Sequence, residues 1–190
     1  MKQYVIIGGG VAAVGCIEGI RSQDQEGKII MIAGEGCPVY CRPLISYYLQ
    51  GKTDLERMKY RDDSFYEKNN CEVIYGTAKK IDVKNKSVLL ESGESVFYDA
   101  LCVAAGSSPF VPPMKYLEAV ENAFCFMTEK DALSLEKAIT PESRVLIIGA
   151  GLIGLKCAEG LCGRVKKITV CDLADRVLSS ILDETCAARM

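Results

Sequence analysis

Two stretches of the chain share one order of hydrophobic and polar positions. Residues 4–35 begin with an aliphatic run, turn on glycines into a segment with apolar residues at helical spacing, and return to a second aliphatic run that ends near an acid. Residues 144–172 repeat this order. Long aliphatic runs are typical of parallel strands that are buried on both faces. Each stretch therefore predicts a strand, a helix and a second strand parallel to the first.

Shorter elements are predicted between the two repeats. A charged stretch near residues 54–69 predicts a helix, and residues 130–139 predict another that leads into the second repeat. Short apolar runs beside turn residues predict four strands, at residues 71–75, 87–91, 95–98 and 100–105.

Composition marks one boundary in the chain. Residues 107–113 are rich in serine and proline, as linkers are. We therefore expect an α/β fold with two Rossmann-like domains, at residues 1–108 and 109–190. Residues 173–190 are enough for one more helix, whereas a nucleotide-binding half normally needs several more strands. The second domain is therefore expected to be incomplete, and the chain to be a truncated part of a longer protein.

The glycines that follow residues 4–7 predict a dinucleotide-binding loop. Gly8 permits a tight turn, Gly10 lets a pyrophosphate approach the backbone, and the small Ala13 lets the helix pack close to the strand. The N–H groups at the start of the helix would meet the pyrophosphate, and the acid after the second strand would accept hydrogen bonds from ribose hydroxyls. The residues predicted to bind the nucleotide here are Gly8, Gly9, Gly10, Val11, Ala12, Ala13 and Glu35.

The second repeat predicts a second loop of the same kind. Glycine turns that bind nothing are common, but two of them, each with a strand, a helix and an acid in place, favour two nucleotide sites. Asp172 favours NAD over NADP because its charge would repel a 2′-phosphate, and the nearby Arg176 weakens this preference. The residues predicted to bind the second nucleotide are Gly149, Gly151, Leu152, Ile153, Gly154 and Asp172.

Composition excludes several classes of function. The chain has no histidine, so it cannot form a Ser-His-Asp triad or a zinc site with imidazole ligands from its own residues. A net charge of −2 offers no basic field for nucleic acid or an anionic membrane. No apolar run approaches the roughly 20 residues that a membrane span needs. We expect no metal site and no catalytic side chain, so that a cofactor or a partner supplies the chemistry.

Ten cysteines raise the question of disulfides. Most of them lie in apolar stretches, where a free thiol behaves as a small buried hydrophobe. The N-terminal apolar run is interrupted by three glycines and followed at once by charged residues, which argues against an export signal. We therefore expect a cytoplasmic protein with free thiols.

Two dinucleotide loops with the sequence VYCRPLIS between them, at residues 39–46, resemble the FAD-dependent pyridine-nucleotide oxidoreductases. The chain is similar over essentially its whole length to rubredoxin reductases, to the flavin region of assimilatory nitrite reductases and to NADH oxidase-like proteins. The resemblance implies that the Gly8 loop and Glu35 hold FAD and that the Gly149 loop holds NAD(P)H, with NADH favoured. In such proteins a second FAD segment and an interface domain follow, so the FAD domain is expected to be incomplete as well.

The resemblance adds residues outside the two loops. It implies that Arg42 and Pro43 lie along the flavin nucleotide. It also implies that Ala105 and Gly106 bind the cofactor, in the stretch YDALCVAAG where the chain leaves the FAD domain. Ala105 stands where the family usually has threonine, and Lys156 stands where the helix after the second loop often has glutamate.

The redox cysteine pair of disulfide reductases is not matched. That pair has the spacing Cys-x4-Cys, whereas Cys37 and Cys41 are separated by three residues and Pro38 interrupts them. Cys157 and Cys162 have the expected spacing but lie in the helix after the second loop. Ordinary thiols are favoured for all four, and a metal-binding or redox role for Cys37 and Cys41 is the minor alternative.

The resemblance implies an oxidoreductase. Hydride would pass from NADH to FAD, and electrons would pass on to an acceptor such as a rubredoxin-like protein, a nitrite reductase centre or oxygen. Two alternatives stay open. The chain is a nucleotide-binding fragment without turnover, or it is an NAD-binding regulatory module, although the latter gives no reason for Arg42 and Pro43.

Overall fold

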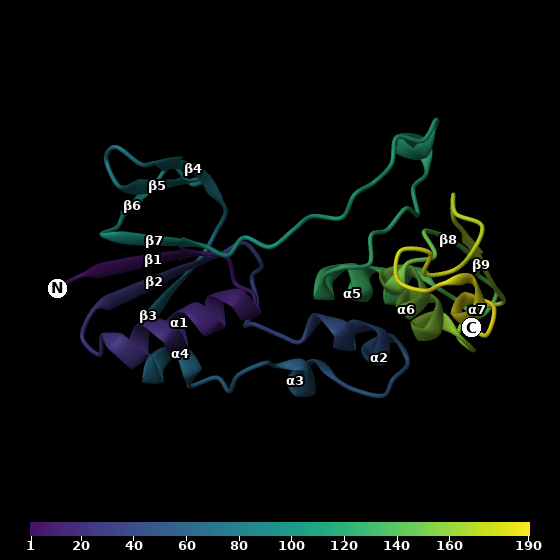
Figure 1. Cartoon of the computed structure of the whole chain (residues 1–190), viewed down its shortest axis with the longest axis horizontal. Helices are drawn as coiled ribbons and strands as arrows, with labels where there is room; N and C mark the ends of the chain where they lie inside the picture. Colours follow the sequence, from purple (N-terminus) through teal and green to yellow (C-terminus); the bar gives the residue numbers. More distant parts are fainter. The chain divides into compact units, whose positions relative to one another are not determined.

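The computed structural model describes residues 1–190 and divides into two compact units (Figure 1). The first unit comprises Met1–Cys41 and Lys59–Ser108, and the second comprises Arg42–Met58 and Pro109–Met190. Each unit contains one of the two predicted repeats.

A parallel sheet forms the centre of the first unit. Its strand order is β3-β2-β1-β7, and all three pairings are parallel. Helix α1, Val11–Gln23, connects β1 to β2, which confirms the predicted strand–helix–strand order. The strands are β1 (Gln3–Ile7), β2 (Lys28–Ala33), β3 (Cys71–Tyr75) and β7 (Ala100–Val103).

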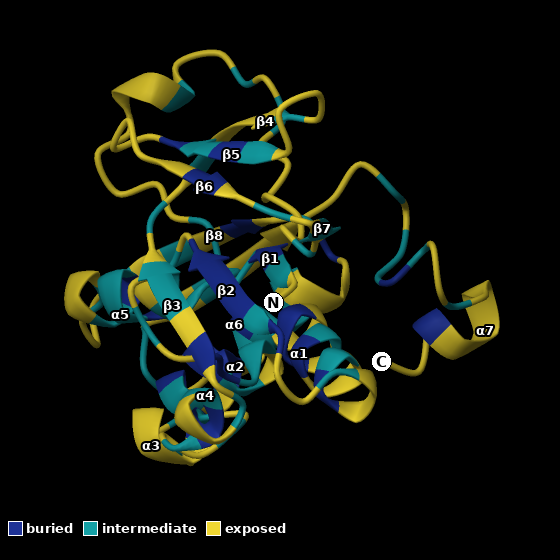
Figure 2. Cartoon of the chain, turned by 90° about the vertical axis from the view of Figure 1, so that its left-hand side faces the viewer, coloured by how far each residue is buried: buried dark blue, intermediate teal, exposed yellow.

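Both faces of this sheet are covered. Alternate residues of a strand point to opposite faces, and Ile6 and Met31 pack in one cluster with Ile17 of α1. Val5 and Ile30 pack in another, against an antiparallel sheet of β4 (Ala78–Asp82), β5 (Ser87–Leu90) and β6 (Ser95–Phe97). Strand β2 is accordingly almost continuously buried (Figure 2).

The second repeat forms the core of the second unit. Strands β8 (Arg144–Ile148) and β9 (Lys167–Cys171) are parallel, and α6 (Leu152–Leu161) connects them. Helices α2 (Ile45–Leu49) and α5 (Glu129–Ala138) pack against this strand–helix–strand unit around one apolar cluster. Its buried members are Leu49, Leu135, Ile147, Cys157 and Leu161.

The remaining helices are short. No helix of the chain is long and apolar enough to cross a membrane. These helices are η1 (Arg42–Leu44), α3 (Leu55–Met58), α4 (Phe65–Lys68), η2 (Leu117–Ala119) and α7 (Glu184–Ala187).

The predicted helix near residues 54–69 is wrong in length. Two short helices, α3 and α4, occupy this stretch. Between them the helix is interrupted, because Tyr40 and Lys59 form an antiparallel bridge and the Tyr60 N–H donates to the Val39 carbonyl over 2.9 Å. Strand β4 was not predicted, because its sequence AKKID lacks the apolar alternation of a strand.

The segment Arg42–Met58 packs in the second unit, although the sequence led us to expect residues 1–108 in one domain. Leu49 of this segment is fully buried against Leu135 and Leu161. The sequence of so short an amphipathic segment does not show which part of the fold will bury its apolar side chains. The chain also passes between the units after Ser108. The assignment of a cofactor to each domain stays a prediction.

Candidate dinucleotide-binding sites

The first glycine loop follows β1 at the carboxyl edge of the sheet. Gly8 has φ 125°, a conformation that favours glycine, and its N–H donates to the Ile32 carbonyl over 2.8 Å. A Cβ at Gly8 would lie 2.0 Å from the carbonyl oxygen of Ala104. Only glycine therefore fits at this position.

The other small residues of the loop differ in their surroundings. A Cβ at Gly9 would lie 2.9 Å from the Cβ of Ala33, whereas a Cβ at Gly10 would meet nothing within 4 Å. Ala13 is fully buried between α1 and the sheet. The space beside Gly10 is thus open, as a close approach by a phosphate group requires.

The second loop repeats much of this geometry. Gly149 has φ 109°, and its N–H donates to the Cys171 carbonyl over 2.7 Å. A Cβ at Gly154 would lie 2.0 Å from the carbonyl oxygen of Gly149, so α6 packs tightly on its own loop. A Cβ at Gly151 would meet nothing within 4 Å. Each loop thus combines a crowded glycine with an open one.

The helices after both loops begin without a side-chain cap. Gly10 precedes α1 and Gly151 precedes α6, and neither helix has a capping hydrogen bond from a side chain. Helix α5, by contrast, has a capping box in which the Asp131 N–H donates to Thr128 Oγ1 over 3.1 Å. The first N–H groups of a helix have no partner within the helix and lie at the positive end of its dipole. The starts of α1 and α6, where Val11, Ala12, Leu152 and Ile153 are exposed, are therefore suited to bind an anion.

The acid of the first repeat lies just beyond β2. Glu35 is half-buried and is flanked by Gly34 and Gly36. The Tyr40 hydroxyl donates a hydrogen bond to Glu35 Oε2 over 2.7 Å. Tyr40 itself is buried. The carboxylate is thus held by a side chain of its own unit.

The acid of the second repeat is held by the backbone instead. The Ala150 N–H donates to Asp172 Oδ2 over 2.6 Å, and the Ala174 N–H donates to Asp172 Oδ1 over 2.8 Å. The Ala174 and Ala150 amides hold the pKa of the Asp172 carboxyl below its usual value. The group is therefore ionised at neutral pH. Arg176, whose charge could offset that of Asp172, forms an ion pair with Asp175 at 3.1 Å.

The other predicted residues lie in both units. Ala105 and Gly106 follow Ala104, the residue whose carbonyl crowds Gly8, and both are exposed. Arg42 and Pro43 lie in the second unit, within the 3-10 turn η1.

Two contacts of the acids could not be predicted from the sequence. Tyr40 belongs to the motif VYCRPLIS, but nothing in the sequence shows that its hydroxyl contacts Glu35. The Ala150 N–H that binds Asp172 belongs to the second loop itself. Both contacts join groups that meet only after folding, so no spacing rule indicates them.

Lys156 contacts an acid and an aromatic ring. Its Nζ lies 2.6 Å from Glu159 Oε2 and 5.1 Å from the centre of the Tyr47 ring. The lysine therefore forms an ion pair with its own helix and packs over α2.

The ten cysteines are all free thiols. Burial raises the pKa of the Cys71 and Cys157 thiols to about 11. Burial and the neighbouring Cys102 raise the pKa of the Cys16 thiol to about 11. Such thiols contain little of the reactive thiolate at neutral pH. No group of three or more potential metal ligands is present.

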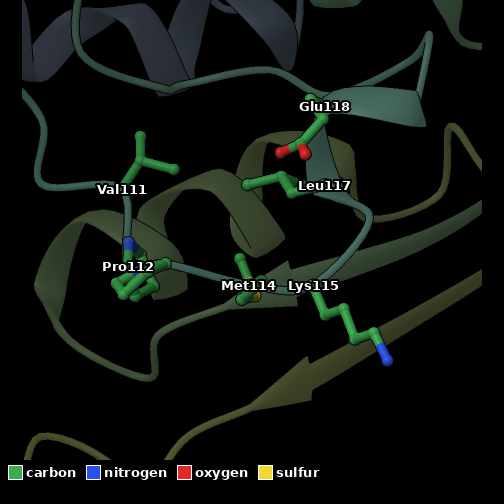
Figure 3. Close-up of a pocket in the computed structure, with 7 residues that line it drawn as sticks. Val111, Pro112, Met114, Lys115, Leu117 and Glu118 are labelled. Atoms are coloured by element: carbon green, nitrogen blue, oxygen red, sulfur yellow. The ribbon is translucent and has the colours of Figure 1, made fainter.

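A shallow hollow of the second unit lies outside both loops. Its lining residues all come from one stretch, Val111–Lys115 with Leu117 and Glu118. Figure 3 shows Val111, Pro112 and Leu117 around the hollow, while Lys115 extends away. None of the predicted nucleotide-binding residues contributes to it. We therefore assign the hollow no role in nucleotide binding.

Comparison with known proteins agrees with the two glycine loops. A model of the pyridine nucleotide-disulphide oxidoreductase family matches residues 2–190. The chain belongs to this family. Proteins of this family bind FAD and NAD(P)H.

Two curated relatives illustrate the range of the family. The chain is 31% identical over 188 residues to an NADH-dependent phenylglyoxylate dehydrogenase subunit epsilon from Aromatoleum evansii, with 97% of this chain and 44% of the relative covered. It is 34% identical to a nitrite reductase [NAD(P)H] from Bacillus subtilis, with 97% of this chain and 23% of the relative covered. The chain thus spans less than half the length of either relative.

A solved structure has the same fold over nearly the whole chain. NADH:rubredoxin oxidoreductase from Clostridium acetobutylicum superposes with a TM-score of 0.85 at 25% sequence identity, covering 98% of this chain and 48% of that protein. The α/β architecture of this chain is therefore that of the N-terminal part of a known reductase.

Proposed function

We propose that this chain forms the FAD-binding and NADH-binding part of an electron-transfer oxidoreductase, in which NADH supplies a hydride to FAD. The observation that carries the proposal is the presence of two uncapped helix starts, each beside a glycine with open space. Bound FAD and NADH supply the redox chemistry, and the protein binds and orients them.

The first loop is proposed to hold FAD. The N–H groups at the start of α1 would bind the pyrophosphate, which approaches the backbone at Gly10 because no Cβ is present there. Glu35 would accept hydrogen bonds from the adenosine ribose. Arg42, Pro43, Ala105 and Gly106 are proposed as further contacts of this cofactor, on the strength of the resemblance alone.

The second loop is proposed to hold NADH in preference to NADPH. The Asp172 carboxyl is ionised at neutral pH, and backbone amides hold its pKa below the usual value. A fixed negative charge at the end of β9 would repel a 2′-phosphate and accept hydrogen bonds from an unmodified ribose. Gly149, Gly151 and Gly154, with the start of α6, would bind the pyrophosphate of NADH.

The electron acceptor is proposed to be a redox protein or centre. One similar structure carries rubredoxin in its name, and one relative is a nitrite reductase. Those names support acceptance of electrons by a rubredoxin-like protein or by a nitrite reductase centre; oxygen is the third candidate. The rates at which one NADH-reduced preparation passes electrons to each of these acceptors would rank them.

Cofactor retention tests the proposed function. The purified 190-residue chain is mixed with FAD, separated from free FAD by gel filtration and examined for flavin absorbance. We expect FAD to elute with the protein. A colourless protein after this treatment would contradict the proposal that this chain holds FAD.

One alternative has support in the structure. The chain spans less than half of its relatives, and the sheet of the second unit has only two strands, with Leu146 and Ile148 exposed. A nucleotide-binding part without turnover of its own fits these observations. It predicts FAD retention without reduction by NADH, which separates it from the leading proposal.

A further inference from the structure

Glu35 lies on a backbone that does little to fix its side chain. It follows the last residue of β2, Ala33, in a bend between Gly34 and Gly36. Glycine accepts many backbone conformations, and a glutamate side chain has several rotatable bonds to restrict. A carboxylate that is to bind a ribose in one orientation therefore needs support from elsewhere in the fold.

Tyr40 provides such support from a fixed position. Its hydroxyl lies 2.7 Å from Glu35 Oε2, and only 6% of the residue is exposed. The backbone of Tyr40 pairs with Lys59 in an antiparallel bridge, and the neighbouring Val39 carbonyl accepts a hydrogen bond from Tyr60 over 2.9 Å. Packing and backbone pairing thus hold the phenol that contacts the acid.

We infer that Tyr40 is a positioning residue for the nucleotide, whose hydroxyl holds the Glu35 carboxylate in the orientation that accepts the adenosine ribose hydroxyls of FAD. This inference rests on the proposed function. A carboxylate offers about four lone-pair sites, so a hydrogen bond from a phenol is compatible with ribose hydroxyls at the same group.

The second repeat offers a contrast within the same chain. Asp172 is shorter than glutamate by one methylene group, and the Ala150 and Ala174 amides fix both of its oxygens. Its orientation needs no side-chain donor. The longer Glu35 receives a hydrogen bond from a residue five positions away. The role of Tyr40 is therefore specific to the first repeat.

The first test compares two tyrosines that each donate to a carboxylate. Tyr40→Phe removes the hydroxyl that contacts Glu35. Tyr4→Phe is the matched control, because the Tyr4 hydroxyl donates to Asp24 Oδ2 over 2.9 Å in the same unit, beyond the end of α1. We expect the FAD dissociation constant, measured by calorimetry on the 190-residue chain, to rise about tenfold in Tyr40→Phe, which is 1.4 kcal/mol, and to stay unchanged in Tyr4→Phe.

A second measurement separates positioning from packing. In a Glu35→Ala background, Tyr40→Phe should cause no further loss of FAD affinity, because the hydroxyl has no carboxylate to hold. An equal loss in both backgrounds, or equal affinities of Tyr40→Phe and the unchanged chain, would overturn the inference alone. Failure of the unchanged chain to bind FAD would overturn the proposed function and the inference with it.

Discussion

At Gly10 and Gly151, the requirements of ligand binding can be separated from those of folding. Gly8 is crowded by Ala104 and has a positive φ, so its requirement for glycine is met within the fold itself. Gly10 and Gly151 have an extended backbone, and a Cβ at either position would meet open space, so the fold alone permits a larger residue. The need for glycine there would come from a ligand.

Gly10→Ala should therefore weaken FAD binding while leaving the fold intact. The added methyl group would occupy the space proposed for the pyrophosphate, and we expect the FAD dissociation constant to rise at least about tenfold. The free energy of unfolding should change by no more than about 1 kcal/mol, the scale of a substitution at a helix N-cap. Calorimetry and urea unfolding measure the two effects.

Gly8→Ala is the matched control for this substitution. Its Cβ would lie 2.0 Å from the Ala104 carbonyl oxygen, and its φ of 125° strains any side chain. It should lower both stability and binding. Equal FAD affinities of Gly10→Ala and the unchanged chain would contradict a pyrophosphate site at this loop.

Asp172 makes the second loop sensitive to pH. Because the pKa of its carboxyl is lowered in the folded chain, the ionised form stabilises the fold above the usual carboxyl pKa of 3.8, and this stabilisation is lost as the pH falls through the folded value. Asp172→Asn should lower the melting temperature at pH 7, because a single amide oxygen replaces two acceptors. The difference from the unchanged chain should shrink toward about pH 3. A difference that is the same at both pH values would contradict the role of the ionised carboxylate.

The sequence predicts the conformation of the loop glycines better than the surroundings of the two acids. The requirements at Gly8 and Gly149 are local, since they concern the φ of one residue after a strand. The contact between Tyr40 and Glu35 depends on how a bend and a bridge fold together. Spacing in the sequence carries no information about that geometry.

At the scale of elements, the sequence does not show which helices α2 packs against. A Cβ at Gly160 of α6 would lie 3.1 Å from the Ser46 carbonyl oxygen and 3.3 Å from the Cβ of Leu49. The two helices are thus in close backbone contact at a glycine. Arg164 and Tyr48 add hydrogen bonds to Glu136 of α5.

Leu49→Ala tests the packing of α2 in the second unit. Leu49 is fully buried among Leu135, Ile147 and Leu161, and a buried leucine replaced by alanine costs about 2–5 kcal/mol of unfolding free energy. Leu55→Ala, in the same segment but with a partly exposed side chain, should cost less than about 1 kcal/mol. Urea unfolding of both variants gives the comparison, and equal losses would contradict the burial of α2.

The regular elements could be predicted because each has a continuous pattern of its own. The aliphatic runs of β1, β2, β8 and β9 and the helices between them show in the sequence. Strand β4 does not show, because two adjacent lysines interrupt any apolar alternation and only its pairing with β5 makes it a strand. Elements that depend on a distant partner are those that a single sequence leaves out.

At the scale of the molecule, the two units carry one glycine loop each. Family membership covers residues 2–190, while the relatives extend well beyond the matched length. The central proposal is that each loop binds a different cofactor, FAD at Gly10 and NADH at Gly151. It predicts that changes at the two loops affect different cofactors.

The most direct test is the absorbance of FAD bound to the 190-residue chain while NADH is added in the absence of oxygen. We predict that NADH bleaches the flavin bands of the unchanged chain. Gly151→Ala should bind FAD as well as the unchanged chain does but need at least about tenfold more NADH for the same bleaching. Bound FAD whose absorbance NADH leaves unchanged, or a Gly151→Ala chain that responds like the unchanged one, would contradict the proposal.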